Sequence, residues 1–265
     1  MAQKTKQSVW MKMLLSLLFF LVTIYIAIAS LLYFKQRDFI YYPAPSIAHK
    51  YSEMSIPHQG ETIKVISLNS TKPQAILYFG GNAESVEYNI DDFYHYFPNY
   101  SIYLVKYRGY GGSTGKPSET ALYSDALYIF DKIKQKHNAI TVIGRSLGSG
   151  VASFVASKRE LDKLILITPF DSILSVAQER FPIYPLSLML KDKYDSLSRV
   201  KAIKAKVLML IAENDQVISA THSNRLYRAF PSTQVSKIII ENTNHNNIAT
   251  NKMYYQSIRK FLKND

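Results

Sequence analysis

The 265-residue sequence contains no cysteine. This absence excludes a disulfide framework, a thiol nucleophile and any metal site built from thiolates. Acidic residues are missing before Asp38, although the whole chain has a formal net charge of +12. The basic residues are spread along the chain without a basic stripe interleaved with aromatics, so we expect no nucleic-acid partner. Attraction to an anionic membrane surface fits this charge balance better.

Internal repeats, low-complexity tracts and a second domain boundary are also missing from the sequence. A chain of this length, 47% hydrophobic and 20% charged, suits one α/β domain with a short appendage. Its single break in composition lies near Lys35 to Asp38. We therefore predict a membrane anchor over residues 1–36 and one globular domain over residues 37–265.

The appendage contains an uncharged apolar run of 22 residues from Met13 to Phe34. A helix needs about 20 such residues to cross a bilayer. Trp10 and Tyr33 lie near the two ends of the run, where aromatic side chains meet the membrane interfaces. Basic residues flank it on both sides: Lys4, Lys6, Lys12, Lys35 and Arg37. The run predicts one transmembrane helix, with membrane lipid as a partner.

Two other interpretations of this run are a buried core helix and a cleaved signal peptide. A core helix rarely stays uncharged on every face over this length. Ala27 and Ala29 form a small-residue cleavage pattern before Ser30, which makes the signal peptide the stronger alternative. The run continues past that site to Phe34, which favours an uncleaved anchor. A slight excess of lysine before the run predicts a cytoplasmic N-terminus and an exported globular domain.

After the anchor, short apolar runs alternate with segments of helical pattern, which predicts a doubly wound, mostly parallel α/β sheet. The predicted strands are 75–79, 102–105, 140–144, 164–168, 207–212 and 238–241. The predicted helices are 84–97, 118–136, 149–158, 220–230 and 251–262. In such a fold the loops after the parallel strands meet at one edge of the sheet.

The sequence GRSLG, Gly144 to Gly148, lies where the strand 140–144 must turn into a helix. The pattern G-x-S-x-G in this context is typical of a nucleophile elbow, a strained turn whose neighbouring positions need glycine. The alternative is a serine in an ordinary glycine-rich turn. We predict that Ser146 is exposed at the edge of the sheet as a nucleophile.

A serine hydroxyl needs a base, and the base needs a carboxylate to orient it. In this type of fold the chain order is serine, acid, histidine. Asp215 follows the strand 207–212 and His245 follows the strand 238–241, so both are predicted to reach the edge where Ser146 lies. Asp171, after the strand 164–168, is the main rival for the acid, and Glu213 is a second one. The other histidines precede the nucleophile or, like His222, fall in a helical pattern.

An acyl-transfer site also needs hydrogen-bond donors for the oxyanion. Leu147, the residue after the nucleophile, offers one backbone amide. The loop FGGNAES, Phe79 to Ser85, is predicted to offer a second through Asn82, although Gly-Gly-Asn is also good chemistry for a purely structural turn. We expect no cofactor and no metal.

Six segments in order resemble the Bem46-like branch of the α/β-hydrolases, close to the eukaryotic ABHD13 and ABHD17 groups. They are FGGNAES, YRGYGGSTGKPSE, GRSLGSG, ITPFDSI, ENDQVIS and TNHNNI. The resemblance begins near Phe39, where FIYYPAP is similar to the strand with which the family's domain starts. It implies an α/β-hydrolase fold, a triad of Ser146, Asp215 and His245, and an oxyanion hole at Asn82 and Leu147.

Members of that branch commonly carry an N-terminal membrane anchor, and some are palmitoyl-protein thioesterases. Two positions depart from the family: Gly80 replaces the usual histidine, and Lys106 stands where an acidic residue is common. Between the strands 164–168 and 207–212, the apolar segment from Phe181 to Leu190 forms either a small cap over an acyl pocket or an ordinary covering helix.

We therefore predict a membrane-anchored serine hydrolase that cleaves a carboxylic ester or an acyl thioester. One alternative is a serine aminopeptidase of the same fold, although no clear acidic cluster for a substrate amino terminus is present. Another is a non-catalytic, membrane-tethered binding protein whose elbow is vestigial; a complete triad in the expected order argues against it.

Overall fold

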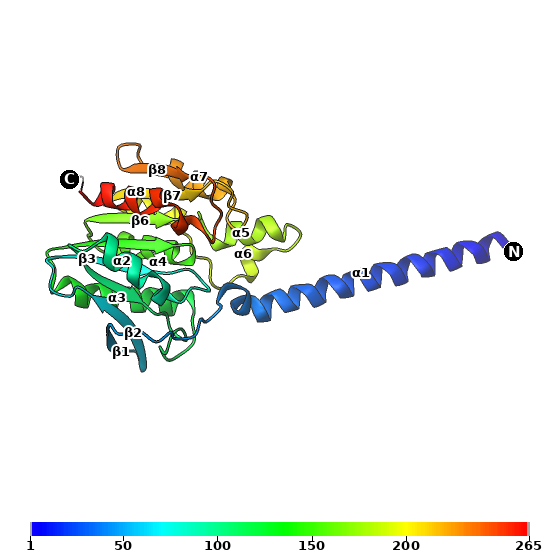
Figure 1. Ribbon diagram of the computed structural model, residues 1–265. Coiled ribbons are helices and arrows are strands. Elements are labelled where there is room, and N and C mark those ends of the chain that lie inside the picture. The colour runs from blue at the N-terminus through cyan, green and yellow to red at the C-terminus, as the bar shows by residue number, and fades with distance from the viewer. Residues whose placement is uncertain (1, 264–265) are drawn as a thin grey trace.

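The computed structural model describes residues 2–263, and for residues 2–8, which include Lys4 and Lys6, it describes the backbone alone. The chain begins with the helix α1 (Ala2–Ile40), which projects far from the rest of the molecule (Figure 1). One apolar stretch of α1, Val9–Ile40, is long enough to cross a membrane by length and composition. The predicted boundary between residues 36 and 37 falls inside this helix.

Within the described residues, eight strands form one sheet in the order β1-β2-β4-β3-β5-β6-β7-β8. From β4 onward in that order all neighbouring strands are parallel, whereas β1 and β2 run antiparallel. The strands are β1 (Ser52–His58), β2 (Glu61–Leu68), β3 (Gln74–Phe79), β4 (Ser101–Val105), β5 (Ala139–Arg145), β6 (Lys163–Ile167), β7 (Lys206–Ala212) and β8 (Val235–Ile240). The six predicted strands and the predicted mostly parallel α/β fold are confirmed.

The start of the domain differs from the sequence prediction. FIYYPAP does not form a strand, because Phe39 and Ile40 complete α1 and residues 41–49 have no regular structure. Pro43 and Pro45 have no backbone N–H to donate to a sheet. The first strand is β1, whose polar, half-exposed sequence gave no apolar run to recognise.

Helices cover both faces of the sheet, as the buried side chains show. The helices of the globular part are η1 (Val86–Asn89), α2 (Ile90–Tyr96), α3 (Glu119–Lys134), α4 (Leu147–Lys158), α5 (Ile173–Arg180), α6 (Leu186–Met189), η2 (Leu197–Ala202), α7 (Ala220–Ala229), η3 (Ile248–Thr250) and α8 (Lys252–Lys263). Alternate residues of β3 separate the two faces: Leu77 belongs to the core under α3, α4 and α7, and Ile76 to the core under α2 and α8.

The short helices α5 and α6 lie on the side of the domain from which α1 projects (Figure 1). They belong to the connection between β6 and β7, and we call residues 173–190 the cap. The last turns of α1 are fastened beside it: the Gln36 side chain bonds the Met189 carbonyl and the Lys191 amide, and Arg37 pairs with Asp192 at 2.9 Å. Gln36 is buried. The C-terminal end of α1 is therefore part of the packed domain.

Candidate active site

Ser146 occupies a sharp turn between β5 and α4. Its backbone has φ 50° and ψ −117°, a region that residues with a side chain rarely adopt. The turn leaves no room for side chains beside it, because a Cβ at Gly144 would overlap the Gly148 carbonyl and a Cβ at Gly148 would overlap the Phe79 carbonyl. This is the strand–turn–helix context that defines a nucleophile elbow.

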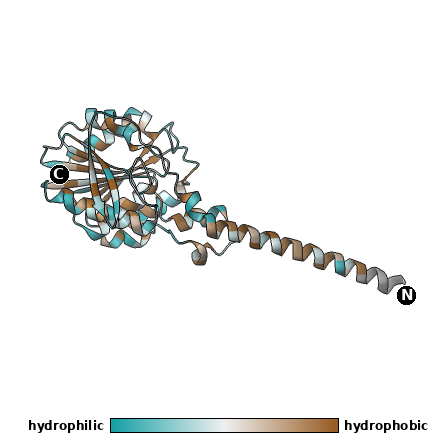
Figure 2. Cartoon of the chain, turned by 90° about the horizontal axis from the view of Figure 1, so that it is seen from below, coloured by the Kyte–Doolittle hydropathy of each residue, from teal (hydrophilic) through white to brown (hydrophobic). Residues whose placement is uncertain are grey.

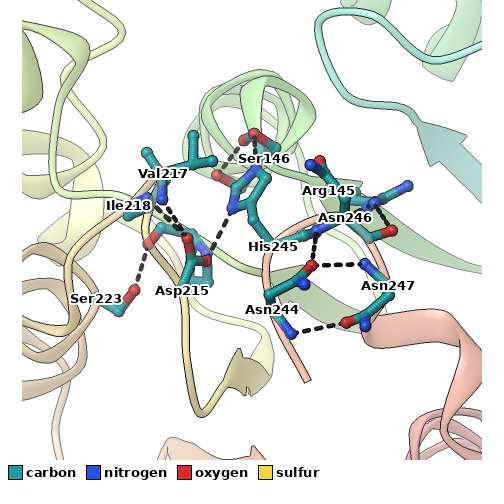
Figure 3. A network of polar contacts seen from close by, with 12 residues as sticks. Arg145, Ser146, Asp215, Val217, Ile218, Ser223, Asn244, His245, Asn246 and Asn247 are labelled. Carbon is teal, nitrogen blue, oxygen red and sulfur yellow. Dashed lines mark hydrogen bonds and ion pairs between the residues drawn. The ribbon is translucent and has the colours of Figure 1, made fainter. Parts of the chain in front are cut away.

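Ser146, His245 and Asp215 form one chain of hydrogen bonds (Figure 3). The Ser146 Oγ lies 2.8 Å from His245 Nε2, and His245 Nδ1 lies 2.8 Å from an oxygen of Asp215. The other Asp215 oxygen accepts hydrogen bonds from the backbone amides of Val217 and Ile218, at 2.9 and 2.8 Å. The Asp215 side chain is only 4% exposed, so these contacts fix its orientation.

The loop after β8 holds His245 by contacts to its backbone. The Asn244 side chain accepts hydrogen bonds from the amides of Asn246 and Asn247, and the Asn247 side chain accepts one from the Asn244 amide. Arg145 donates to the carbonyls of His245 and Asn246, at 3.2 and 3.1 Å (Figure 3). The loop therefore closes on itself and is fastened to the residue that precedes Ser146.

Arg145 also links this loop to the one after β3. It lies 3.3 Å from Glu84, whose carboxylate accepts the Gly81 amide and the Tyr78 hydroxyl, each at 2.6 Å. Burial by itself lowers the pKa of Arg145, but the Glu84 carboxylate together with Tyr78 and Tyr254 more than offsets this and holds the pKa above its usual value. Sequence reasoning missed both residues. The signals available were a charged residue inside each of the two glycine motifs, GRSLG and FGGNAES.

The loop Phe79 to Ser85 lies against the nucleophile, since a Cβ at Gly81 would stand 3.7 Å from the Cβ of Ser146. Asn82 and Leu147 both line the cavity that contains Ser146. In the described part of the chain, neither backbone amide donates to another protein group. The Asn82 side chain points elsewhere and donates to the Ile40 carbonyl. Both residues are thus near Ser146 with amides available for an acceptor.

The two alternative acids, Asp171 and Glu213, bind groups other than His245. Asp171 is fully buried and binds His222 at 2.9 Å and Arg225 at 2.6 Å. Glu213 accepts the Asn242 amide. Three of the other histidines bind partners away from Ser146. His49 pairs with Glu53, His58 with Ser124 and His137 with Tyr103.

A cavity of about 340 Å³ opens above Ser146. This is within the range of about 300–1,000 Å³ that is usual for small-molecule sites. Its walls come from the cap, from the last turns of α1 and from the loop that carries Asp215. The residues are Leu32, Gln36, Phe39, Ile40, Tyr42, Asn82, Ser146, Leu147, Phe170, Ile173, Val176, Ala177, Arg180, Phe181, Leu186, Leu190, Val217 and Ile218. Of the two interpretations of Phe181 to Leu190, the geometry favours the small cap.

A larger hollow of about 690 Å³ lies at the other end of β6 and β7, around Lys163 and Lys206. It contains none of the residues of the elbow or the hydrogen-bond chain, so we do not associate it with the site. Within residues 2–263, no group of three or more histidine and acidic side chains is arranged to hold a metal ion.

Residues 27–247 of the chain match the protein family described as serine hydrolase (FSH1). This match covers most of the chain. The chain belongs to this family. The predicted serine hydrolase class is thus confirmed at the level of the family.

Curated relatives and solved structures agree with this assignment. An uncharacterized protein of Mycobacterium tuberculosis is 32% identical over 168 residues, which cover 61% of this chain and 59% of that protein. The alpha/beta hydrolase domain-containing protein 17C of Xenopus tropicalis is 28% identical over 171 residues, 63% of this chain and 54% of that protein. The chain thus matches less than two thirds of the length of either relative. The predicted likeness to the ABHD17 group is confirmed.

Among solved structures, the Pyrococcus furiosus esterase Pf2001 superposes with a TM-score of 0.66 at 15% identity, over 84% of this chain and 98% of that one. At this identity the likeness establishes the fold.

Proposed function

We propose that this serine hydrolase cleaves a carboxylic ester or an acyl thioester through a triad of Ser146, His245 and Asp215, and that α1 anchors it in a membrane. The observation that carries the proposal is the unbroken chain of hydrogen bonds from Ser146 through His245 to Asp215, with both links at 2.8 Å. A strained elbow and a buried, oriented carboxylate are the features this chemistry requires.

In the first half of the reaction, the Ser146 Oγ attacks the carbonyl carbon of the substrate and its proton passes to His245 Nε2. The carbonyl oxygen becomes an oxyanion that accepts hydrogen bonds from the amides of Leu147 and Asn82. Asp215, through His245 Nδ1, stabilises the imidazolium. When the tetrahedral intermediate collapses, the bond to the alcohol or thiol breaks, and the leaving group takes the proton from His245 Nε2.

In the second half, a water molecule replaces the leaving group. His245 takes one proton from this water as its oxygen attacks the acyl carbon bound to Ser146. Collapse of the second intermediate returns that proton to Ser146 Oγ and releases the carboxylic acid. The net reaction consumes one water per bond cleaved and needs no cofactor.

The cavity favours an acyl group over a peptide amino terminus. Its walls are mostly aliphatic and aromatic, and the one charged side chain among the described lining residues is Arg180, a cation. An aminopeptidase would need a carboxylate there to pair with the substrate ammonium group. A binding protein would not need a serine held in a strained turn with a complete relay behind it. The esterase activity named for the Pyrococcus furiosus structure is of the same reaction class.

The anchor is supported by the apolar stretch of α1, which has a mean hydropathy of 2.6 and no buried residues in its most apolar window. Contacts of Tyr25 to the cap, described below, support an uncleaved helix, because cleavage after Ala29 would remove them. We keep the proposal of a cytoplasmic N-terminus and an exported catalytic domain over residues 37–265. Protease protection of a C-terminal tag in sealed vesicles tests that orientation.

The direct test of the chemistry is Ser146→Ala in the full-length protein. We expect loss of labelling by a fluorophosphonate probe and loss of hydrolysis of a short p-nitrophenyl ester, with an unchanged circular dichroism spectrum. A variant that keeps most of its esterase activity would contradict the assignment of the nucleophile. An acyl-substrate panel then separates ester from thioester and peptide.

A further inference from the structure

The cap and α1 are held side by side over several helical turns. The Tyr25 ring stacks on Tyr184, with centroids 4.7 Å apart, and the Tyr25 hydroxyl donates to the Ile183 carbonyl. Further along α1, the Lys191 ammonium lies 4.6 Å from the centre of the Tyr33 ring. With the contacts of Gln36 to Met189 and Lys191, these fix the depth of each part of the cap along α1.

That depth can be compared with the apolar run. Tyr25 precedes Phe34, the last residue of the run, by nine residues, or about 14 Å along a helix axis. The hydrocarbon core of a bilayer is about 30 Å thick. If α1 crosses a membrane over this run, the cap tip at Ile183 and Tyr184 therefore lies well inside one leaflet. Tyr33, Lys35 and Lys191 then lie at the interface, where aromatic and lysine side chains are favoured.

The side chains at the cap tip suit this depth. Leu188 is 86% exposed and Ile183 69% exposed, and Phe181 is also exposed. Ile183, Tyr184 and Met189 contact α1 directly, so these exposed apolar side chains belong to a segment that lies beside the apolar helix, which is mostly brown in Figure 2. Exposed apolar surface of this kind marks contact with a membrane or a partner.

The same two elements form the walls of the cavity. Leu32 and Phe39 of α1 line it on one side and Val176, Phe181 and Leu186 of the cap on another, above Ser146. The cavity thus extends from Ser146 at the edge of the sheet to the junction between the cap and α1.

Resting on the proposed anchor and triad, we infer that the tip of the cap, Phe181 to Leu190, inserts into the lipid leaflet beside α1. The substrate is a membrane-embedded lipid or lipid-modified molecule whose acyl chain enters the cavity sideways from the leaflet. Its carbonyl meets Ser146 near the level of the headgroups, and the chain lies between α1 and the cap. The anchor is then part of the acyl-binding wall as well as a tether.

The first test measures depth. Because the chain has no cysteine, single-cysteine variants of the full-length protein can carry one environment-sensitive fluorophore. We choose Ile183→Cys on the cap, which is 69% exposed, and, as a matched control, Tyr88→Cys on η1, which is 78% exposed. Vesicles of phosphatidylcholine and phosphatidylglycerol contain nitroxide quenchers on the headgroup or midway along the acyl chain. We expect acyl-chain quenching at position 183 and none at position 88. A label at 183 that both quenchers leave bright would overturn the inference and favour a protein partner.

The second test measures activity. Ile183 does not line the cavity, so Ile183→Glu should leave hydrolysis of a short soluble ester unchanged. A buried charge in the leaflet opposes insertion, and we expect hydrolysis of a long-chain acyl ester in the same vesicles to fall by about tenfold. Tyr88→Glu should leave both rates unchanged. Equal long-chain rates for the two variants would overturn the inference.

Failure of the proposed triad or anchor would give results that differ from failure of the inference itself. If the wild-type protein neither reacts with a fluorophosphonate nor cleaves the short ester, the proposed triad fails and the inference falls with it. If alkaline washing extracts the wild-type protein from membranes, the anchor fails, again with the inference. Normal labelling and membrane retention, combined with a water-exposed label at position 183, overturn the inference alone.

Discussion

The molecule contains two buried aspartate–histidine pairs that look alike but have different surroundings. In each, an aspartate from the loop after a parallel strand binds the Nδ1 of a histidine: Asp215 binds His245 at 2.8 Å, and Asp171 binds His222 at 2.9 Å. The opposite ring nitrogens differ. His245 Nε2 meets the Ser146 hydroxyl, whereas His222 Nε2 meets the Glu179 carboxylate of α5 at 2.6 Å.

The difference shows that an aspartate–histidine pair alone does not indicate a catalytic base. His245 has a proton donor on its second nitrogen and can take that proton. His222 has an acceptor there and a carboxylate on each side, and Asp171 also holds Arg225. This second pair joins α7 to the loop after β6 and to the cap, which is a structural task.

Substitution of the two histidines should give the largest difference in activity between the two pairs. We expect His245→Gln to lower kcat/KM for p-nitrophenyl butyrate by about four orders of magnitude or more, because His245 is the general base in our proposal. His222→Gln should lower it by less than about tenfold, while lowering the midpoint of thermal unfolding because a buried hydrogen-bonded group is changed. Initial rates and calorimetry on both variants check this. Equal losses of activity would remove the distinction between the pairs.

The aspartates should show opposite effects on activity and stability. Asp215→Asn keeps the shape of the site but cannot stabilise the imidazolium, and we expect kcat to fall by about 10³- to 10⁴-fold. Asp171→Asn removes the charge that pairs with Arg225, at an expected cost of about 2 kcal/mol in the free energy of unfolding. Its effect on kcat should be small. A greater loss of kcat at Asp171 than at Asp215 would transfer the acid role to Asp171.

The residues of the first pair could be predicted from the sequence because each directly follows an apolar run that reads as a strand. Parallel strands end at one edge of the sheet, so chain order and strand position were enough to bring Ser146, Asp215 and His245 together. The strands β1 and β2 gave no such signal. They lie at the antiparallel end of the sheet, and their sequences SEMSIPH and ETIKVISL mix polar with apolar residues.

Contacts between loops were beyond sequence reasoning. Arg145 and Glu84 are 61 residues apart, and nothing in either motif states that the two charges meet. The packing of α1 on the cap is similar: an apolar run predicts a membrane helix whether or not its last turns form the wall of a cavity. Sequence periodicity reports which side chains are buried, and it does not report their partners.

Glu84 offers an intermediate test, because it supports the first pair without touching a substrate in our proposal. Glu84→Gln removes the charge partner of Arg145 and weakens the bond to the Gly81 amide. We expect kcat to fall by about 10- to 100-fold through misplacement of the loops that carry His245 and Asn82, with KM nearly unchanged. A rise in KM with kcat retained would argue against a positioning role. Glu84→Asp should restore part of the rate if charge is what matters.

The smallest expected effect concerns the second nitrogen of His222. The Glu179 side chain is 56% exposed, and exposed ion pairs contribute about 0–1 kcal/mol. Glu179→Gln should therefore shift the unfolding midpoint by no more than roughly 3 °C and leave the short-ester rate within about twofold of wild type. The matched position on the first pair is Ser146, where we expect loss of the hydroxyl that meets His245 Nε2 to remove activity. Scanning calorimetry and initial rates on Glu179→Gln are sufficient. A tenfold loss of activity would mean that the bond from Glu179 to His222 holds the cap over the cavity, and the second pair would then belong to the catalytic apparatus as a positioning element.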